Sequence, residues 1–437
     1  MIRRFSFEDF KSCRSVDLPL APLTVLIGAN ASGKSNVLEG IRLLSWLAGG
    51  RNLDEILHAV QEADQLVRGA VTDICRFGTK EFVLGCRLDD GYSLRLVLRP
   101  SESDLRVVFE SLGKSSDKVP LYSIKAPSSG YSNEVQVEYN NFARGGTKPC
   151  IACTDQQAVF TQLLTPARFA AHHKESQRLI PATTSNLRKS LTDILFLDPV
   201  PRLMRDYSYA NEVRLKEDGS NVSSVLRHVV FKEGDVADAE AKQQVLSFIR
   251  SLPEQSIEDV EFIETPRREV MVRLVETFGE TNHGTDAPLL SDGTLRVLAI
   301  AAALLSAKEG LLVIIEEIDN GVHPSRASEL VTNILKTAKA QKIQVLLTTH
   351  NPALLDALPA ESIPSVVACY RDPHDGTTKL IRLEDVSRYP DLVAQGPVGR
   401  LMTAGILDRF LKSAETAAQR KESSLAWLAS LESGEGN

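Results

Sequence analysis

Cysteine and net positive charge are both scarce in this sequence. Six cysteines in a chain of 437 residues are too few for a disulfide framework, which favours a reducing, cytoplasmic setting. The formal net charge is −7, so no general positive field attracts the chain to nucleic acid, and any such contact needs a local basic patch. The 43% of hydrophobic and 24% of charged residues exclude disorder and coiled coil, and indicate a globular protein.

Apolar runs long enough to cross a membrane are also absent. The most apolar stretch, residues 295–315, is interrupted by Lys308, Glu309 and Gly310, which predicts a buried helix, a turn and a buried strand. The N-terminus becomes acidic at Glu8 and has no apolar core, so we expect no secretory signal. We therefore expect a soluble protein without a membrane partner.

The hydrophobic pattern divides the chain into four parts. We expect a first lobe over residues 1–164, a mostly helical insertion over 165–284, a second lobe over 285–410 and a helical tail over 411–437. The first lobe should hold a buried strand ending at Ile27, a helix and an antiparallel β lobe. In the second lobe, expected helices alternate with expected strands, which is typical of a parallel α/β sheet. These elements are helices at 294–307 and 324–339 and strands at 311–316 and 343–348.

An octapeptide after the first buried strand fits the phosphate-binding pattern G-x-x-x-x-G-K-[ST]. Its sequence is Gly28-Ala29-Asn30-Ala31-Ser32-Gly33-Lys34-Ser35. The two glycines permit backbone angles that aim N–H groups at an anion, and the helix that follows adds its positive end. Lys34 can reach the β and γ phosphates of a nucleotide, and the Ser35 hydroxyl can bind Mg²⁺. The alternative is a chance glycine turn, which the flanking strand and helix disfavour.

Two apolar segments end in polar residues that would meet at one edge of a parallel sheet. Residues 311–315 are followed by Glu316 and Glu317, and residues 343–347 lead to His350. We predict that Glu316 holds Mg²⁺ and that Glu317 activates the attacking water as a general base. His350 would contact the γ phosphate. The alternatives are a strand that simply ends in solvated acids and a histidine with a structural role.

A second helix start with anion-binding character follows Leu290. Ser291 and Gly293 lie at the N-terminal end of the helix expected near 294–307, where backbone N–H groups suit an anion. One chain has one γ phosphate and already has one cradle, so this start is expected to contact the nucleotide of another copy. A simple helix cap by serine and aspartate is the alternative.

Together these segments resemble those of the ABC-type ATPases of the RecF, SMC and OLD group, especially compact prokaryotic AAA family ATPases. The matching segments are 10–12, 28–36, 290–296, 316–324, 349–352 and the "dGsN" segment at 215–222. The resemblance implies an α/β fold of the P-loop NTPase class, an ABC-type head with a parallel sheet, an antiparallel β lobe and a mostly helical insertion. It also implies ATP and Mg²⁺ as ligands.

Site residues and partners follow from the same resemblance. Lys11, Asn30, Ser32 and Asn36 would join Gly28, Gly33, Lys34 and Ser35 in binding the nucleotide. Two copies would form a head-to-head homodimer, in which Ser291 and Gly293 of one copy face the γ phosphate held by Lys34 of the other. Residues 319–323 would lie at that dimer seam.

Three departures from the family pattern predict slow turnover. Ala31 stands where the loop usually has glycine, Glu316 where the wider class has aspartate, and Asp292 where the signature usually has glycine. Too few residues follow His350 for the nuclease domain of some relatives, so the resemblance implies an ATPase that controls a separate effector, such as a nuclease, in prokaryotic anti-phage defence.

Two alternatives stay open. The first is a nucleotide-gated scaffold or sensor with little turnover. The second is a RecF-like DNA-repair ATPase, which would use the locally basic segment 165–216 to bind DNA. A solvated helical face is the plainer interpretation of that segment.

Overall fold

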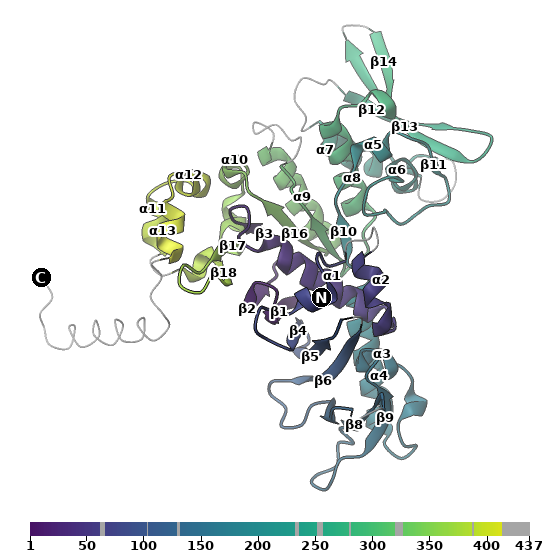
Figure 1. Ribbon diagram of the computed structural model, residues 1–437. Coiled ribbons are helices and arrows are strands. Elements are labelled where there is room, and N and C mark those ends of the chain that lie inside the picture. The colour runs from purple at the N-terminus through teal and green to yellow at the C-terminus, as the bar shows by residue number, and fades with distance from the viewer. Residues whose placement is uncertain are drawn as a thin grey trace, which may run out of the picture.

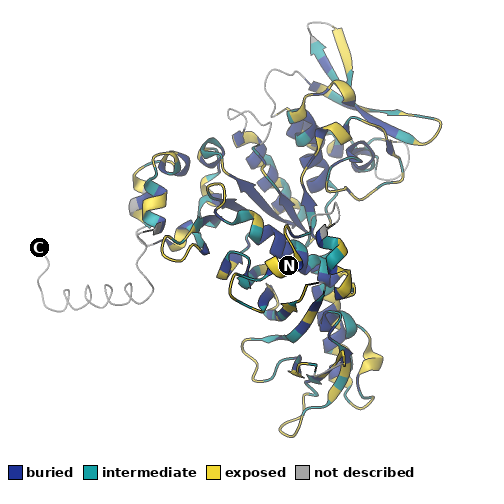
Figure 2. Cartoon of the chain, in the orientation of Figure 1, coloured by how far each residue is buried: buried dark blue, intermediate teal, exposed yellow. Residues whose placement is uncertain are grey.

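The computed structural model describes residues 1–61, 66–102, 104–128, 132–231, 236–250, 257–278, 281–319, 327–386 and 389–412. A central body of strands and helices carries an antiparallel lobe at one end and a second, smaller sheet at the other (Figure 1). Buried residues concentrate in the central strands and their flanking helices, while exposed residues line the projecting parts (Figure 2).

The main sheet has fourteen strands among the described residues, in the order β10-β15-β16-β3-β17-β18-β2-β1-β4-β5-β6-β7-β8-β9. Its central strands are β1 (Ile2–Phe10), β2 (Cys13–Pro19), β3 (Leu23–Ile27), β10 (Leu195–Leu197), β15 (Leu312–Ile315), β16 (Gln344–Thr349), β17 (Val366–Arg371) and β18 (Thr378–Arg382). The antiparallel lobe contains β4 (Phe82–Leu88), β5 (Tyr92–Pro100), β6 (Leu105–Lys114), β7 (Tyr122–Ala126), β8 (Glu134–Tyr139) and β9 (Cys150–Thr154).

The strands β10, β15, β16, β3 and β17 run parallel to one another. Ile315 pairs with Leu347, and Thr349 pairs with Ile27, so these strands end at the same edge. Their residues are buried on both faces, as the apolar runs predict. The predicted parallel α/β core is confirmed.

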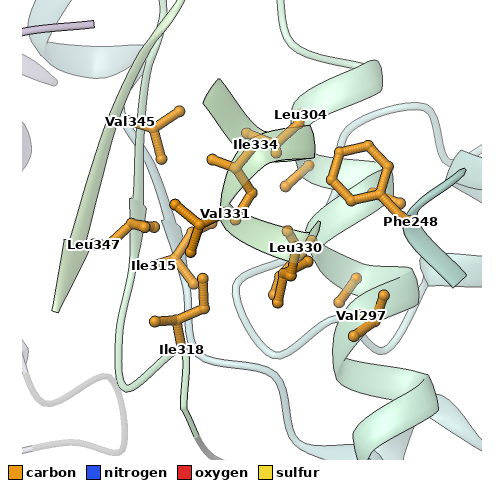
Figure 3. Packing of buried hydrophobic residues seen from close by; sticks show 14 of the residues in the cluster. Phe248, Val297, Leu304, Ile315, Ile318, Leu330, Val331, Ile334, Val345 and Leu347 are labelled. Atoms are coloured by element: carbon orange, nitrogen blue, oxygen red, sulfur yellow. The ribbon is translucent and has the colours of Figure 1, made fainter. Parts of the chain in front are cut away.

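Helices cover both faces of this core. One face packs against α1 (Lys34–Ala48) and α4 (Lys174–Thr192), which share a hydrophobic cluster with Leu26, Ile314 and Leu346. The other face packs against α8 (Asp292–Leu305) and α9 (Ala327–Gln341). Figure 3 shows this second face, where Ile315 and Leu347 meet helix residues such as Val331. Alternate strand residues therefore serve two separate cores.

The segment predicted as a mostly helical insertion is helical only in its first part. It contains α5 (Pro201–Met204), α6 (Val222–Val230) and α7 (Ala239–Ile249), and then a second sheet of β11 (Ser208–Tyr209), β12 (Ile257–Glu264), β13 (Glu269–Phe278) and β14 (Thr281–Asp286). The prediction is wrong for residues 257–286. In β13, Val270, Val272 and Leu274 are buried at every second position, which is the period of a strand. Strand β10 also joins the main sheet, so the segment is not a separate insertion.

The remaining helices are short. They are α2 (Ile56–Gln61), α3 (Val159–Gln162), α10 (Pro352–Asp356), α11 (Tyr389–Ala394), α12 (Val398–Thr403) and α13 (Ile406–Lys412). Within the described ranges, no helix is both long and apolar enough to cross a membrane. The predicted tail at 411–437 lies outside the described residues after Lys412.

Candidate nucleotide-binding site

The phosphate loop connects β3 to α1 and leaves the start of α1 open to an anion. Gly33 is the N-cap residue, with φ 113°, and no side chain caps the helix. A Cβ on Gly33 would collide with Thr378 Oγ1, and one on Gly28 would collide with the carbonyl oxygen of Cys369. Any larger residue at either position would therefore clash with these atoms, so both positions require glycine. The first turn of α1 carries no acidic residue that would repel a phosphate.

Lys34 lies over this loop and close to acids of the second lobe. Its Nζ donates to the carbonyl oxygens of Gly28 at 2.6 Å and Ala29 at 3.1 Å. Burial lowers the pKa of Lys34, while Cys369 and the carboxylates of Glu317 and Asp319 act in the opposite direction. The fold thus brings the loop lysine within electrostatic reach of the acids that follow β15.

Thr378 braces the loop from β18. Its Oγ1 donates to the carbonyl oxygen of Ser32 at 3.0 Å and also bonds Ser12 Oγ at 2.7 Å. Asn36 Nδ2 donates to the same Ser12 oxygen at 2.6 Å. Asn36, predicted to bind nucleotide, therefore supports the loop in this conformation. Its predicted contact with the nucleotide stays a prediction.

Three other predicted binding residues differ in their surroundings. The hydroxyl of Ser32 is buried and has no hydrogen-bond partner, and its N–H bonds the Ala29 carbonyl at 3.2 Å. Lys11 forms an ion pair with Glu39 and donates to the Arg68 carbonyl at 2.7 Å. Asn30 is exposed. Among the described residues, a ligand would therefore have to displace existing bonds of Lys11 but none of the Ser32 hydroxyl.

The two acids after β15 have different environments. Glu316 Oε1 accepts from Arg42 Nη2 at 2.8 Å, and Glu316 shares a pocket of about 720 Å³ with Ser35. The two residues predicted to bind Mg²⁺ are thus brought together. Glu317 has φ 45°, a left-handed angle, and its N–H donates to Thr348 Oγ1 at 2.9 Å. Such an angle is unfavourable for a residue with a Cβ, so the hydrogen bond helps to hold the turn that presents this carboxylate.

His350 lies beside Asp319. Its Nδ1 is 3.7 Å from Asp319 Oδ2, and the side chain of Asp319 is only 6% exposed. The other oxygen of Asp319 is buried and has no hydrogen-bond partner among the residues that the structure describes. A buried acceptor of this kind is expected to find a donor when a ligand or second chain completes the site. The remaining seam residues, 320–323, lie outside the described residues.

The second helix start is closed by its own residues. Ser291 is the N-cap of α8, and its Oγ accepts from the Thr294 N–H at 3.1 Å. Asp292 forms an ion pair with Arg205 at 2.6 Å. The capping alternative from the sequence is therefore observed. Ser291 and Gly293 are not among the described residues that line the pocket of Ser35 and Glu316, so their predicted contact with a nucleotide stays a prediction.

Sequence reasoning missed Arg42 and Thr378. Arg42 lies roughly two turns along α1 from Ser35, on the same helix face, and this spacing could have suggested it. Thr378 is distant from the loop in sequence, and no local pattern marks it.

This chain is an ABC-type ATPase of the RecF, SMC and OLD group. The class is defined by the parallel strands, the phosphate loop and the acids at the end of β15. The family described as "AAA domain, putative AbiEii toxin, Type IV TA system" matches residues 23–141 and 166–356, and the chain belongs to this family.

Two curated proteins are similar to this chain. An OLD nuclease of Thermus scotoductus is 22% identical over 367 residues, which cover 82% of this chain and 60% of that protein. The chain thus spans less than two thirds of that relative's length. The DNA replication and repair protein RecF of Rhodococcus erythropolis is 49% identical over 51 residues, 11% of this chain and 12% of RecF.

Two solved SMC heads match most of this chain at low sequence identity. An SmcHead bound to the C-winged helix domain of ScpA is 13% identical, with a TM-score of 0.46, and covers 87% of this chain and 96% of its own. The SMC head domain from Thermotoga maritima is 10% identical, with a TM-score of 0.34, over 87% of this chain and 98% of its own.

Proposed function

We propose that this chain binds Mg²⁺ and ATP at residues 28–35 and hydrolyses ATP in a sandwich formed by two copies. The observation that carries the proposal is the meeting of the two lobes at the phosphate loop. Lys34 lies within electrostatic reach of Glu317 and Asp319, and Ser35 shares a pocket with Glu316. A phosphate-binding loop and two carboxylates that lie at the same edge of the sheet suit the transfer of a phosphoryl group to water.

The residues present fit a metal–nucleotide ligand. The α1 start has no side-chain cap, both loop glycines are required by space, and oxygen donors from Ser35 and Glu316 suit Mg²⁺. When bound, Mg²⁺ neutralises phosphate charge at these two residues. Lys34 would exchange its bonds to the carbonyl oxygens of Gly28 and Ala29 for phosphate oxygens, and would stabilise the charge that develops during transfer.

Glu317 would act on the attacking water. Its carboxylate accepts a proton while the water oxygen bonds to the γ phosphorus, and the bond to the ADP oxygen breaks. His350 would donate a hydrogen bond to the γ phosphate. The hydroxyl of Ser291 and the N–H of Gly293 from a second copy would bind the same phosphate from the opposite side.

The biological role that we propose is control of a separate effector, such as a nuclease, in cytoplasmic anti-phage defence. The similarity to an OLD nuclease and the family description support this direction. A nucleotide-gated scaffold with little turnover is a second candidate, which one observation favours: Arg42 pairs with the Mg²⁺-binding candidate Glu316, so Mg²⁺ has to compete with this arginine.

DNA binding through segment 165–216 receives less support. Arg168 donates to the Ala152 carbonyl at 2.5 Å and to Cys153 Sγ at 3.3 Å, and Arg178 forms an ion pair with Glu175 at 2.6 Å. These cations are already engaged within the protein, so a phosphate backbone would have to compete for them.

Phosphate release by the purified chain tests the proposal. With Mg·ATP, we expect release that depends on Lys34 and Glu317, measured with and without duplex DNA. If ATP binds but no phosphate appears, with or without DNA, the scaffold candidate replaces the ATPase. If Mg·ATP does not bind saturably, both candidates fail.

A further inference from the structure

The segment Leu215–Val222, which matches the "dGsN" motif, has no role in the function proposed above. It is joined to the pocket of Glu316 through Arg42, and to the helix start at Ser291 through α5 and Arg205. Glu217 and Asp218 line the same pocket as Ser35 and Glu316. The contacts continue from this pocket to α8 in three steps.

The first step is Arg42 on α1. Its guanidinium forms ion pairs with Glu316, at 2.8 Å, and with Glu217. The side chain is only 16% exposed, and the guanidinium carbon lies 4.3 Å from the centre of the Phe196 ring. A guanidinium can bridge two carboxylates because its donors form a rigid fork. The carboxylate predicted to hold Mg²⁺ therefore shares its cation with the Leu215–Val222 segment.

The second step joins this segment to α5. The Asp198 N–H donates to the Glu217 carbonyl at 3.0 Å, and the Val200 N–H donates to the Asp218 carbonyl at 2.9 Å. Val200 is the N-cap of α5. Gly219 has φ 71°, and a Cβ there would lie 3.1 Å from Met204 Sδ on α5. The glycine of the motif thus permits both the turn and the close packing of the segment on this helix.

The third step joins α5 to residues 290–296, the segment that matches the family's signature. Arg205 directly follows α5, and its Nη2 donates to the Leu290 carbonyl at 3.1 Å and to Asp292 Oδ1 at 2.6 Å. Leu290 and Asp292 flank Ser291, the N-cap of α8. Arg205 therefore holds the backbone carbonyl before, and the side chain after, the serine that we propose to meet a second copy's nucleotide.

We propose that these contacts couple the metal site to the signature, with Arg42 and Arg205 as positioning residues and the Leu215–Val222 segment as the link. This inference rests on the proposed function. When Glu316 turns to Mg²⁺, Arg42 loses one of its two carboxylates and moves towards Glu217. The segment, α5 and Arg205 move with it, and the helix start at Ser291 is reset for the second copy.

Thermodynamic linkage allows the coupling to be measured by changing residues near Ser291 and following metal binding at Glu316. If metal binding at Glu316 biases the helix start at Ser291, a change at that helix start must alter metal binding by the same factor. Arg205 is not among the described residues that line the pocket of Ser35 and Glu316. An effect of Arg205 on Mg²⁺ therefore has to pass through the intervening contacts.

The test compares ATP affinity with Mg²⁺ and with EDTA, by calorimetry at concentrations where the chain is monomeric. In wild type we expect Mg²⁺ to tighten ATP binding. Mg²⁺ at Glu316 has to displace Arg42, and the reset at Ser291 has to break the contacts of Arg205. Arg42→Ala and Arg205→Ala should therefore each enlarge this tightening about three- to tenfold and leave the affinity in EDTA nearly unchanged. Because both act on one path, the effect of the double variant should not exceed the larger of the two single effects. Arg42→Lys, which keeps the charge without the fork, should show a smaller change than Arg42→Ala.

Arg214→Ala is the matched control, because Arg214 precedes the segment and its side chain donates to the Thr192 carbonyl, at 3.3 Å, outside this path. The Arg214 carbonyl accepts from Asn221 Nδ2 at 2.8 Å, and this backbone bond is kept in the variant. It should behave as wild type. The inference is overturned if Arg205→Ala shows the wild-type Mg²⁺ effect, if the two single effects multiply, or if Arg214→Ala matches Arg205→Ala. Absence of ATP binding by wild type would instead contradict the proposed function itself.

Discussion

The N-terminal ends of α1 and α8 differ in whether the protein itself occupies them. We call the start of α1 the open end, because no side chain of the described residues caps it. The start of α1 has a glycine N-cap, no capping side chain and no acid in its first turn. The start of α8 is capped by Ser291, and its Asp292 is paired with Arg205. The first is ready for an anion, whereas the second must rearrange its own contacts before it can bind one. We infer that the first end sets ATP binding and the second sets turnover.

Loss of the cation at the open end should have the largest effect. Lys34→Ala removes charge-assisted hydrogen bonds to phosphate, and we expect Mg·ATP affinity to fall about 30- to 100-fold. Calorimetry checks this. Lys342→Ala is the control, because that lysine pairs with Glu309 on the surface. Unchanged affinity in Lys34→Ala would refute the assignment of the open end.

Loss of the base should separate binding from turnover. Glu317→Gln keeps the shape of the side chain but cannot accept the water's proton, so hydrolysis should fall about 10²- to 10⁴-fold while ATP affinity stays within a few-fold. Single-turnover phosphate release measures the chemical step. Glu309→Gln, at an exposed ion pair, should have no effect. Normal turnover in Glu317→Gln would show that another group activates the water.

Two substitutions at Ser291 distinguish a cap from a phosphate contact. Asp caps a helix about as well as Ser, whereas Ala costs about 1 kcal/mol of stability. A simple cap therefore predicts that Ser291→Asp is normal and Ser291→Ala is impaired. Our account predicts the reverse order for hydrolysis, because a carboxylate repels the second copy's γ phosphate. Urea denaturation and phosphate release on both variants give the answer.

The smallest effect is expected at Ala31, in the loop of the open end. Its φ of 63° is unfavourable for a residue with a Cβ. Ala31→Gly should therefore raise the free energy of unfolding by about 0.5–1 kcal/mol, with little change in ATP affinity. A loss of stability in urea denaturation would mean that the alanine methyl group makes a favourable contact.

Local patterns in the sequence predict the open end well and the other regions less well. The loop, β3 and α1 follow from adjacent residues, and so do the acidic end of β15 and the cap at Ser291. The second sheet was missed because β13 is an amphipathic strand whose apolar partner, α6, lies far from it in sequence. The bond of Thr378 to the loop joins distant segments, so no spacing rule could indicate it. The helical spacing of Arg42 from Ser35 could have placed Arg42 on the site's face of α1, but not its bond to the distant Glu316.

A mixing experiment tests most directly whether two copies share one site. Lys34→Ala lacks the cradle but keeps Ser291, and Ser291→Asp keeps the cradle but has an altered signature. In a mixed dimer one composite site has both intact parts, so an equal mixture should recover up to about a quarter of wild-type hydrolysis from two nearly inactive variants. If the mixture stays as inactive as its components, the nucleotide held by Lys34 is not completed by Ser291 of another copy.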